Sequence, residues 1–146
     1  MTKILNHIAA VIAGSLVLGA ASFVAAPSTA EAASCWYHNG SLMRLTANGA
    51  RRTFTYVQPR AVLRRAGVRR GTVLFTGRKS GNRYVGTARR FSKFCPGNPL
   101  KYSVSGPVSA SQTRVTVSGS RPVHKACRPT GRNAWDTLVF TYSHRC

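Results

Sequence analysis

Acidic residues are almost missing from this sequence. Its 146 residues include 22 lysines and arginines but only 2 acidic residues, Glu31 and Asp136, which gives a formal net charge of +20. Such a chain cannot neutralise its cations internally, so its electric field attracts polyanions. Most of the cations are arginine, whose planar fork suits phosphate, sulfate and carboxylate groups. The simpler alternative is a solubilising surface encoded by a GC-rich genome.

Motifs for metal, nucleotide and acyl-transfer chemistry are missing as well. There is no Gly-x-Ser-x-Gly elbow, no phosphate-binding P-loop and no dinucleotide fingerprint. The cysteines include no Cys-x-x-Cys pair and the histidines include no His-x-x-x-His pair, which are common ligand spacings for zinc. We therefore expect no metal site and no cofactor.

The first 32 residues are predicted to be a secretory signal peptide. Lys3 provides a basic start, apolar or small residues fill positions 8–26, and Ala30-Glu31-Ala32 forms a small-x-small cleavage site. The run is nearly long enough for a membrane anchor, but its glycines and alanines make it weakly hydrophobic. We expect a single domain at 33–146, exported to the periplasm or the extracellular space, with no transmembrane segment.

Four cysteines follow the predicted leader and predict two disulfides, because an even number in an exported chain is typical of a cross-linked domain. Cys35 and Cys146 lie at the two ends of the domain, and a closed meander brings its first and last strands together. Cys95 and Cys127 lie in predicted loops that flank the strand pair at 100–118. Of the three possible pairings, we expect Cys35–Cys146 and Cys95–Cys127.

Alternating apolar and polar residues predict β-strands along most of the domain. The central segment, 71–90, reads as a hairpin because two runs of β-branched and aromatic residues flank a polar break. About seven strands are expected, at 41–47, 50–58, on the two arms of the 71–90 hairpin, and at 100–105, 114–118 and 136–142. Strands in sequence order with close turns favour an all-β fold, an antiparallel meander closed into a small barrel or folded as a sandwich.

Turn residues set the expected pairing within the hairpins. An Asn48-Gly49 turn places Met43 opposite Phe54, and a four-residue loop at 79–82 places Phe75 opposite Gly86. Strand glycines of the central hairpin then lie under aromatic rings of the partner strand. The inward positions form an aromatic interior, expected to be a packed core rather than a pocket. Its predicted members are Met43, Phe54, Tyr56, Phe75, Tyr84, Tyr102, Phe140 and Tyr142.

One short surface helix is predicted at 59–66, since Pro59 suits a first helical turn and Gly67 a helix end. The helix and the loop that follows it carry five arginines and no acidic residue. This segment is the predicted anion-binding site, and a solvated cationic face is the alternative. The five arginines are Arg60, Arg64, Arg65, Arg69 and Arg70.

Three segments of the domain carry a family resemblance. They are Trp36-Tyr37-His38-Asn39-Gly40-Ser41-Leu42-Met43-Arg44-Leu45, Gly71-Thr72-Val73-Leu74-Phe75 and Gly81-Asn82-Arg83-Tyr84-Val85-Gly86-Thr87-Ala88. Together they resemble a family of small exported bacterial proteins of unknown function, and the likeness extends over nearly all of the domain. The resemblance implies that the domain is one unit, and it implies no activity and no catalytic residue.

We expect a non-catalytic protein that binds anionic polymers of the cell envelope, such as lipid phosphate, lipopolysaccharide or acidic polysaccharide. Once the leader is removed Asp136 is the only acidic residue, which excludes a hydrolase with paired catalytic carboxylates. Arginine pairs and surface aromatics such as Tyr37 and Trp135 would also suit nucleic acid. An exported protein meets envelope polyanions more often than nucleic acid, so these rank first.

Two further alternatives belong to other classes of protein. A ribonuclease-like site would use His38, His124 and His144 as acid and base, with an arginine or lysine holding the phosphate. An inhibitor or protein-interaction module would present the loops at 96–99 and 119–133 to a partner. Polyanion binding should weaken steeply with salt, whereas an inhibitor loop should keep most of its affinity.

Overall fold

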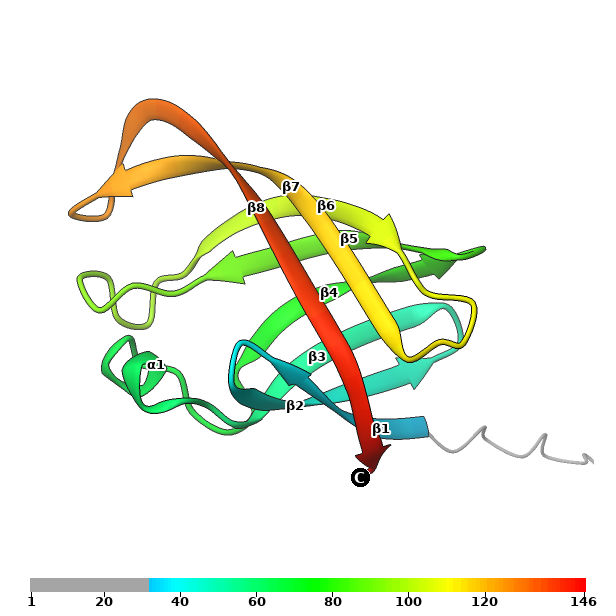
Figure 1. Cartoon of the computed structure of the whole chain (residues 1–146). Coiled ribbons are helices and arrows are strands. Elements are labelled where there is room, and N and C mark those ends of the chain that lie inside the picture. Colours follow the sequence, from blue (N-terminus) through cyan, green and yellow to red (C-terminus); the bar gives the residue numbers. More distant parts are fainter. Residues whose placement is uncertain (1–31) are drawn as a thin grey trace, which may run out of the picture.

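The computed structural model describes residues 32–146 as a closed antiparallel barrel of eight strands with one short helix (Figure 1). The elements are β1 (Ala32–His38), β2 (Ser41–Asn48), β3 (Arg51–Gln58), α1 (Ala61–Arg65), β4 (Val73–Ser80), β5 (Arg83–Arg90), β6 (Leu100–Pro107), β7 (Arg114–Lys125) and β8 (Arg128–Arg145). Each strand pairs with the next in the chain, and β8 returns to pair with β1. The all-β meander closed into a barrel is confirmed. Apart from Ala32, the predicted signal peptide lies outside the described residues.

The strand that raises the predicted number from seven to eight is β1. It pairs with β2 along its whole length and with the end of β8, so it closes the barrel. The turn from β1 to β2 consists of Asn39 and Gly40, whose φ angles of 45° and 74° are both positive, as a type I′ hairpin turn requires.

The predicted pairing is wrong by two residues in both early hairpins. Met43 lies opposite Tyr56 and Leu45 opposite Phe54, because the turn is Gly49-Ala50 and Asn48 still pairs with Arg51. In the central hairpin the turn is Gly81-Asn82 rather than a four-residue loop. A shift of two residues leaves every side chain on its predicted face.

The central hairpin therefore pairs its two glycines with each other. Gly77 lies opposite Gly86, and a Cβ added to Gly86 would lie 2.6 Å from the Cα of Gly77. No larger residue fits without moving the backbone. The rings of Phe75 and Tyr84 stack on the same inward face, with centroids 6.2 Å apart.

The predicted loop at 119–133 is instead a β-ribbon. β7 continues to Lys125 and β8 begins at Arg128, so only Ala126 and Cys127 form the turn (Figure 1). Prolines 122 and 129 had indicated a loop, since proline cannot donate a ladder hydrogen bond. The ribbon accommodates them with a shift in register between Pro122 and His124.

A packed core fills the barrel. Phe54 and Phe140 stack face to face with centroids 3.8 Å apart, and Trp36 meets Phe54 edge-on at 5.8 Å. Seven of the eight predicted interior residues are buried, whereas Tyr142 is 38% exposed and was placed wrongly. Its position near the end of β8 lets its ring lie against the edge of Trp36 while part of it faces solvent.

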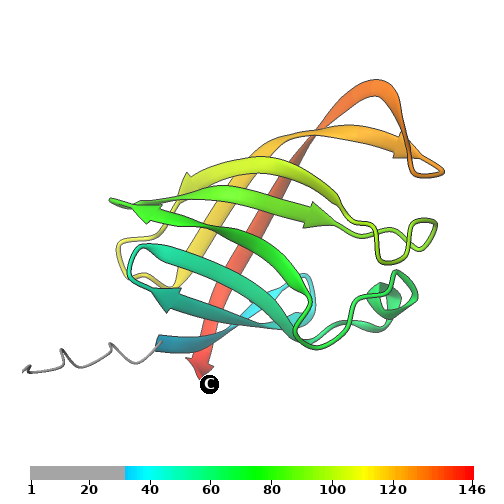
Figure 2. The same ribbon diagram turned by 180° about the vertical axis from the view of Figure 1, so that it is seen from behind.

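The helix α1 is shorter than predicted and lies beside one end of the barrel, which we call the open end (Figures 1 and 2). Leu63 packs against the core from this side together with Phe91. Gly67, with φ of 85°, follows the helix as expected for a helix end. No helix among residues 32–146 is long and apolar enough to cross a bilayer.

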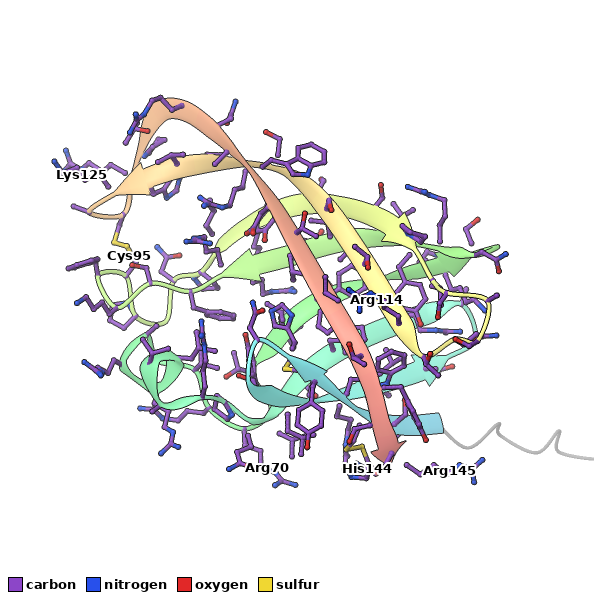
Figure 3. All side chains as sticks on the ribbon, in the orientation of Figure 1. Arg70, Cys95, Arg114, Lys125, His144 and Arg145 are labelled. Carbon is purple, nitrogen blue, oxygen red and sulfur yellow. A yellow bond between two sulfur atoms is a disulfide. The ribbon has the colours of Figure 1, made fainter. Side chains whose placement is uncertain are left out.

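Two disulfides are present, Cys35–Cys146 and Cys95–Cys127, with Cα–Cα distances of 5.2 and 5.7 Å. The first joins β1 to the end of β8 next to the seam where the barrel closes. The second ties the 91–99 loop to the turn of the β7–β8 ribbon at the open end (Figure 3).

Candidate anion-binding site

Polar side chains collect at the open end because they continue the inward-facing series of their strands. On β5 the inward positions Tyr84, Gly86 and Ala88 lead to Arg90, and on β8 the positions Phe140 and Leu138 lead to Asp136. Tyr102 on β6 and Arg121 on β7 reach the same place in the same way. Alternation alone therefore carries four polar groups to the mouth of the barrel.

Asp136 is the centre of this group. Its Oδ2 accepts a hydrogen bond of 2.7 Å from the hydroxyl of Tyr102. The same oxygen lies 3.6 Å from Nη1 of Arg90 and 3.4 Å from Nε of Arg121. Burial, and then the hydrogen bond to Asp136, raise the pKa of Tyr102, so its phenol remains a donor. Two guanidinium groups thus share one carboxylate.

His38 is buried next to this group. Its ring stacks on Phe140 with centroids 4.8 Å apart, and its Nδ1 lies 2.9 Å from the carbonyl oxygen of Val139. A carbonyl only accepts, so the proton must be on Nδ1, and Nε2 accepts a hydrogen bond of 3.4 Å from Nδ2 of Asn39. Burial is the main cause that lowers the pKa of His38, and the charge of Arg60 adds to it. The hydrogen bond to Val139 and the charge of Asp136 act in the opposite direction.

A cavity of about 180 Å³ opens at the mouth of the barrel, and we call it the mouth cavity. His38, Arg60, Arg90 and Asp136 are among the residues that line it. Its walls therefore combine three arginines, Arg60, Arg89 and Arg90, with the neutral ring of His38 and a carboxylate that is already bound. Such a cavity favours an anion over a cation.

The structure brings the five predicted arginines to this end but gives them different roles. Arg60 precedes α1 in an extended conformation and lines the mouth cavity, so it does not stack one turn from Arg64 on a helix face. Arg64 and Arg65 project from α1 into solvent. Nη1 of Arg69 donates to the carbonyl oxygens of Arg64 and Val68 at 2.8 and 3.0 Å, which caps the helix.

Arg70 is exposed and lies at the lower edge of the molecule in Figure 3. Four of the five predicted residues are free to meet a ligand, namely Arg60, Arg64, Arg65 and Arg70, since each is exposed and none of their guanidinium groups has a hydrogen-bond or ion-pair partner among residues 32–146. The sequence did not distinguish these from Arg69, whose role depends on the fold of the loop after the helix.

The histidines proposed for a ribonuclease-like site are not brought together. His38 lines the mouth cavity, His124 lies near the tip of the β7–β8 ribbon, and His144 lies near the C-terminus at the far end of β8 (Figure 3). Within residues 32–146, no group of three His, Cys, Asp or Glu side chains is placed to hold a metal ion.

Comparison with protein-family models, with curated proteins and with solved structures found no match for this chain. The class of protein is therefore defined by its fold and its site. It is a small antiparallel β-barrel with two disulfides, whose open end carries arginines on α1 and a shared carboxylate in the mouth. The resemblance to small exported bacterial proteins stays an expectation.

Acidification should destabilise the barrel through His38. The pKa of this group is lower in the folded state than its ordinary value of 6.5. As the pH falls from 7 towards 5, His38 therefore binds a proton in the unfolded chain before it does so in the folded protein. The free energy of unfolding falls as a result. For a single site this slope cannot exceed about 1.4 kcal/mol per pH unit. Urea unfolding across this range should show the slope.

The matched variants are His38→Gln and His144→Gln. The first should flatten the pH dependence between 7 and 5, because glutamine carries no titrating proton. The second removes an exposed histidine near the C-terminus and serves as the control. A slope that survives in His38→Gln would contradict the assignment.

Proposed function

We propose that this protein is an exported, non-catalytic module that binds anionic polymers of the cell envelope through its open end. The observation that carries the proposal is an imbalance of charge. Asp136 is the only acidic side chain after Glu31, and it is already bound by Tyr102, Arg90 and Arg121. No protein carboxylate is left for the cations of the open end, so an anionic ligand would be the partner that displaces their mobile counterions.

Three segments that project at this end form one surface. Figure 1 shows α1, the 91–99 loop and the tip of the β7–β8 ribbon at the same end of the barrel. The Cys95–Cys127 disulfide joins the loop to the ribbon, and Gly67 lies close enough to Gly97 that an added Cβ would be 3.2 Å from its amide nitrogen. Besides Arg69, which caps α1, the exposed cations of the surface are Arg60, Arg64, Arg65, Arg70, Lys93, Lys125 and Arg128.

Export agrees with the pair of disulfides, since such cross-links persist in oxidising compartments. Anionic lipid and acidic polysaccharide are the polyanions of such a compartment. Val62 on α1 and Phe94 in the 91–99 loop are 51% and 72% exposed. Apolar side chains beside cations favour the surface of an anionic lipid bilayer among these ligands.

The test compares two triple variants that remove the same charge from different ends. Arg64, Arg65 and Arg70 are changed to Gln in the first, and Arg78, Arg83 and Arg114 in the second. Arg69 is kept because it caps α1. At about 1 kcal/mol for each cation near an anionic surface, the first variant should lose more than a hundred-fold in affinity for phosphatidylglycerol vesicles and for a sulfated polysaccharide.

The second variant should lose only a few-fold, because its arginines lie away from α1. Titrations across a salt series measure both. Equal losses would mean that net charge alone drives binding and that there is no site. Binding that hardly changes with salt would favour the protein-interaction module instead.

A further inference from the structure

A second and larger cavity, of about 540 Å³, lies between the 91–99 loop and the tip of the β7–β8 ribbon. We call it the ribbon cavity. The Cys95–Cys127 disulfide forms part of its wall and holds its two sides together (Figure 3). Its volume is within the range of about 300–1,000 Å³ in which small-molecule sites occur. It does not use the arginines of α1.

Apolar groups form much of the ribbon cavity. Phe91, Phe94 and Leu100 line it, together with the disulfide-bonded Cys95 and Cys127. The side chain of Phe94 is 72% exposed. Leaving so large an apolar side chain in water is unfavourable unless a ligand covers it. An apolar chain laid against these residues would bury them.

Cations lie at the inner end of the same cavity. Arg90 and Arg121 both line it, and both contact the carboxylate of Asp136 on their other side. The side chain of Arg121 is only 15% exposed, and its Nε forms no hydrogen bond. Two guanidinium groups against one carboxylate leave one positive charge uncompensated in a partly buried place, which costs free energy unless an anion joins it.

We propose that the ribbon cavity binds a free amphiphile with one apolar chain and a carboxylate head, of the fatty-acid class. The head group is held by Arg90 and Arg121, whose forks suit a carboxylate. The chain lies along Phe91, Leu100 and the disulfide, and Phe94 closes over it. His124 and Lys125 add positive charge at the rim. This site shares Phe94 and Lys125 with the polymer-binding surface proposed above, but it uses none of the arginines of α1.

Decanoate is a suitable probe, with decanol as its uncharged match. Calorimetric titration should give one decanoate per protein and at least ten-fold weaker binding of decanol, because a neutral hydroxyl cannot form the ion pair that a carboxylate forms with the two guanidinium groups. Amide shifts in ¹⁵N spectra should change in 90–100 and 121–127. Decanol that binds as tightly as decanoate, or shifts confined to α1 and the mouth cavity, would overturn the proposal.

Three variants distinguish binding in the ribbon cavity from attraction by the net positive charge of the protein. Arg121→Met should weaken decanoate at least ten-fold and leave decanol unchanged, and Asp136 keeps Tyr102 and Arg90 as partners in this variant. Asn98→Trp, at an exposed position in the cavity wall, should fill the space and weaken both probes. Arg114→Met, far from the cavity, should change neither.

Each variant also gives a result that excludes the site. A loss in Arg114→Met equal to that in Arg121→Met would assign binding to net charge. Unchanged binding in Asn98→Trp would exclude the ribbon cavity, and this test does not depend on whether Arg121→Met folds. Binding to phosphatidylglycerol vesicles without any binding of monomeric decanoate would show that the ligand is a membrane surface rather than a free amphiphile.

Discussion

Replacing both Cys35 and Cys146 with alanine should lower the free energy of unfolding by about 5 kcal/mol. The two cysteines are 111 residues apart in sequence, so their bond closes nearly the whole described chain into one loop. Loop-closure entropy grows with loop length, and the Cys95–Cys127 bond, with a separation of 32, should contribute about 4 kcal/mol by the same arithmetic. The bond also joins β1 to β8 beside the seam that closes the barrel.

Urea unfolding of the two double-alanine variants measures this order. Alanine is chosen because Cys35 is buried and a serine hydroxyl there would need a partner. Near-ultraviolet circular dichroism reports whether the barrel stays closed before denaturant is added. A smaller loss for the Cys35–Cys146 variant than for the Cys95–Cys127 variant would contradict the explanation from loop closure.

The inner face of the barrel could be predicted from the sequence because alternation depends only on neighbouring residues. Phe54, Phe75, Tyr84 and Phe140 were placed inside for this reason, and all are buried. Pairing depends in addition on which residues form the turn, and there Asn48-Gly49 misled the prediction by two positions. The faces survived this error since the side-chain period of a strand is two.

The strand segments that the sequence did not predict, β1 and the ribbon at 119–133, have a composition that is unusual for strands. β1 begins at Ala32, in small residues that resemble the end of a leader peptide. The ribbon at 119–133 contains Pro122, Pro129 and Gly131, which normally mark loops. The ribbon continues the ladder between β7 and β8, which has eleven residue pairs in all, and most of these pairs lie outside 119–133. The composition of the segment itself does not reveal this pairing.

The candidate site likewise contains residues that are neighbours in sequence and residues that only the fold brings together. The arginines of α1 are neighbours in sequence, so their clustering was predictable. The group around Asp136 draws one residue from each of four strands, and only the closed barrel brings them together. A signal was nevertheless present, since Arg90 and Asp136 continue inward-facing series whose other members are apolar. A charged residue in such a series indicates the mouth of a barrel or a buried pair.

The stacked ring of Phe54 should be the most important single side chain of the core. It is fully buried, stacks on Phe140 at 3.8 Å, and meets Trp36 and Phe75 at 5.8 and 6.3 Å. Phe54→Ala removes these contacts and leaves a cavity that the surrounding strands cannot close, because hydrogen bonds on both sides hold β3 in place. We expect a loss of about 3–5 kcal/mol in the free energy of unfolding.

Phe94→Ala is the matched control, with the same chemical change at a position that is 72% exposed. It should alter the free energy of unfolding by no more than about 0.5 kcal/mol. Denaturant titration of both variants gives the comparison directly. A similar loss of free energy of unfolding in the two variants would contradict a stabilising role for the aromatic interior. The stability would then come from the hydrogen bonds between strands and from the disulfides.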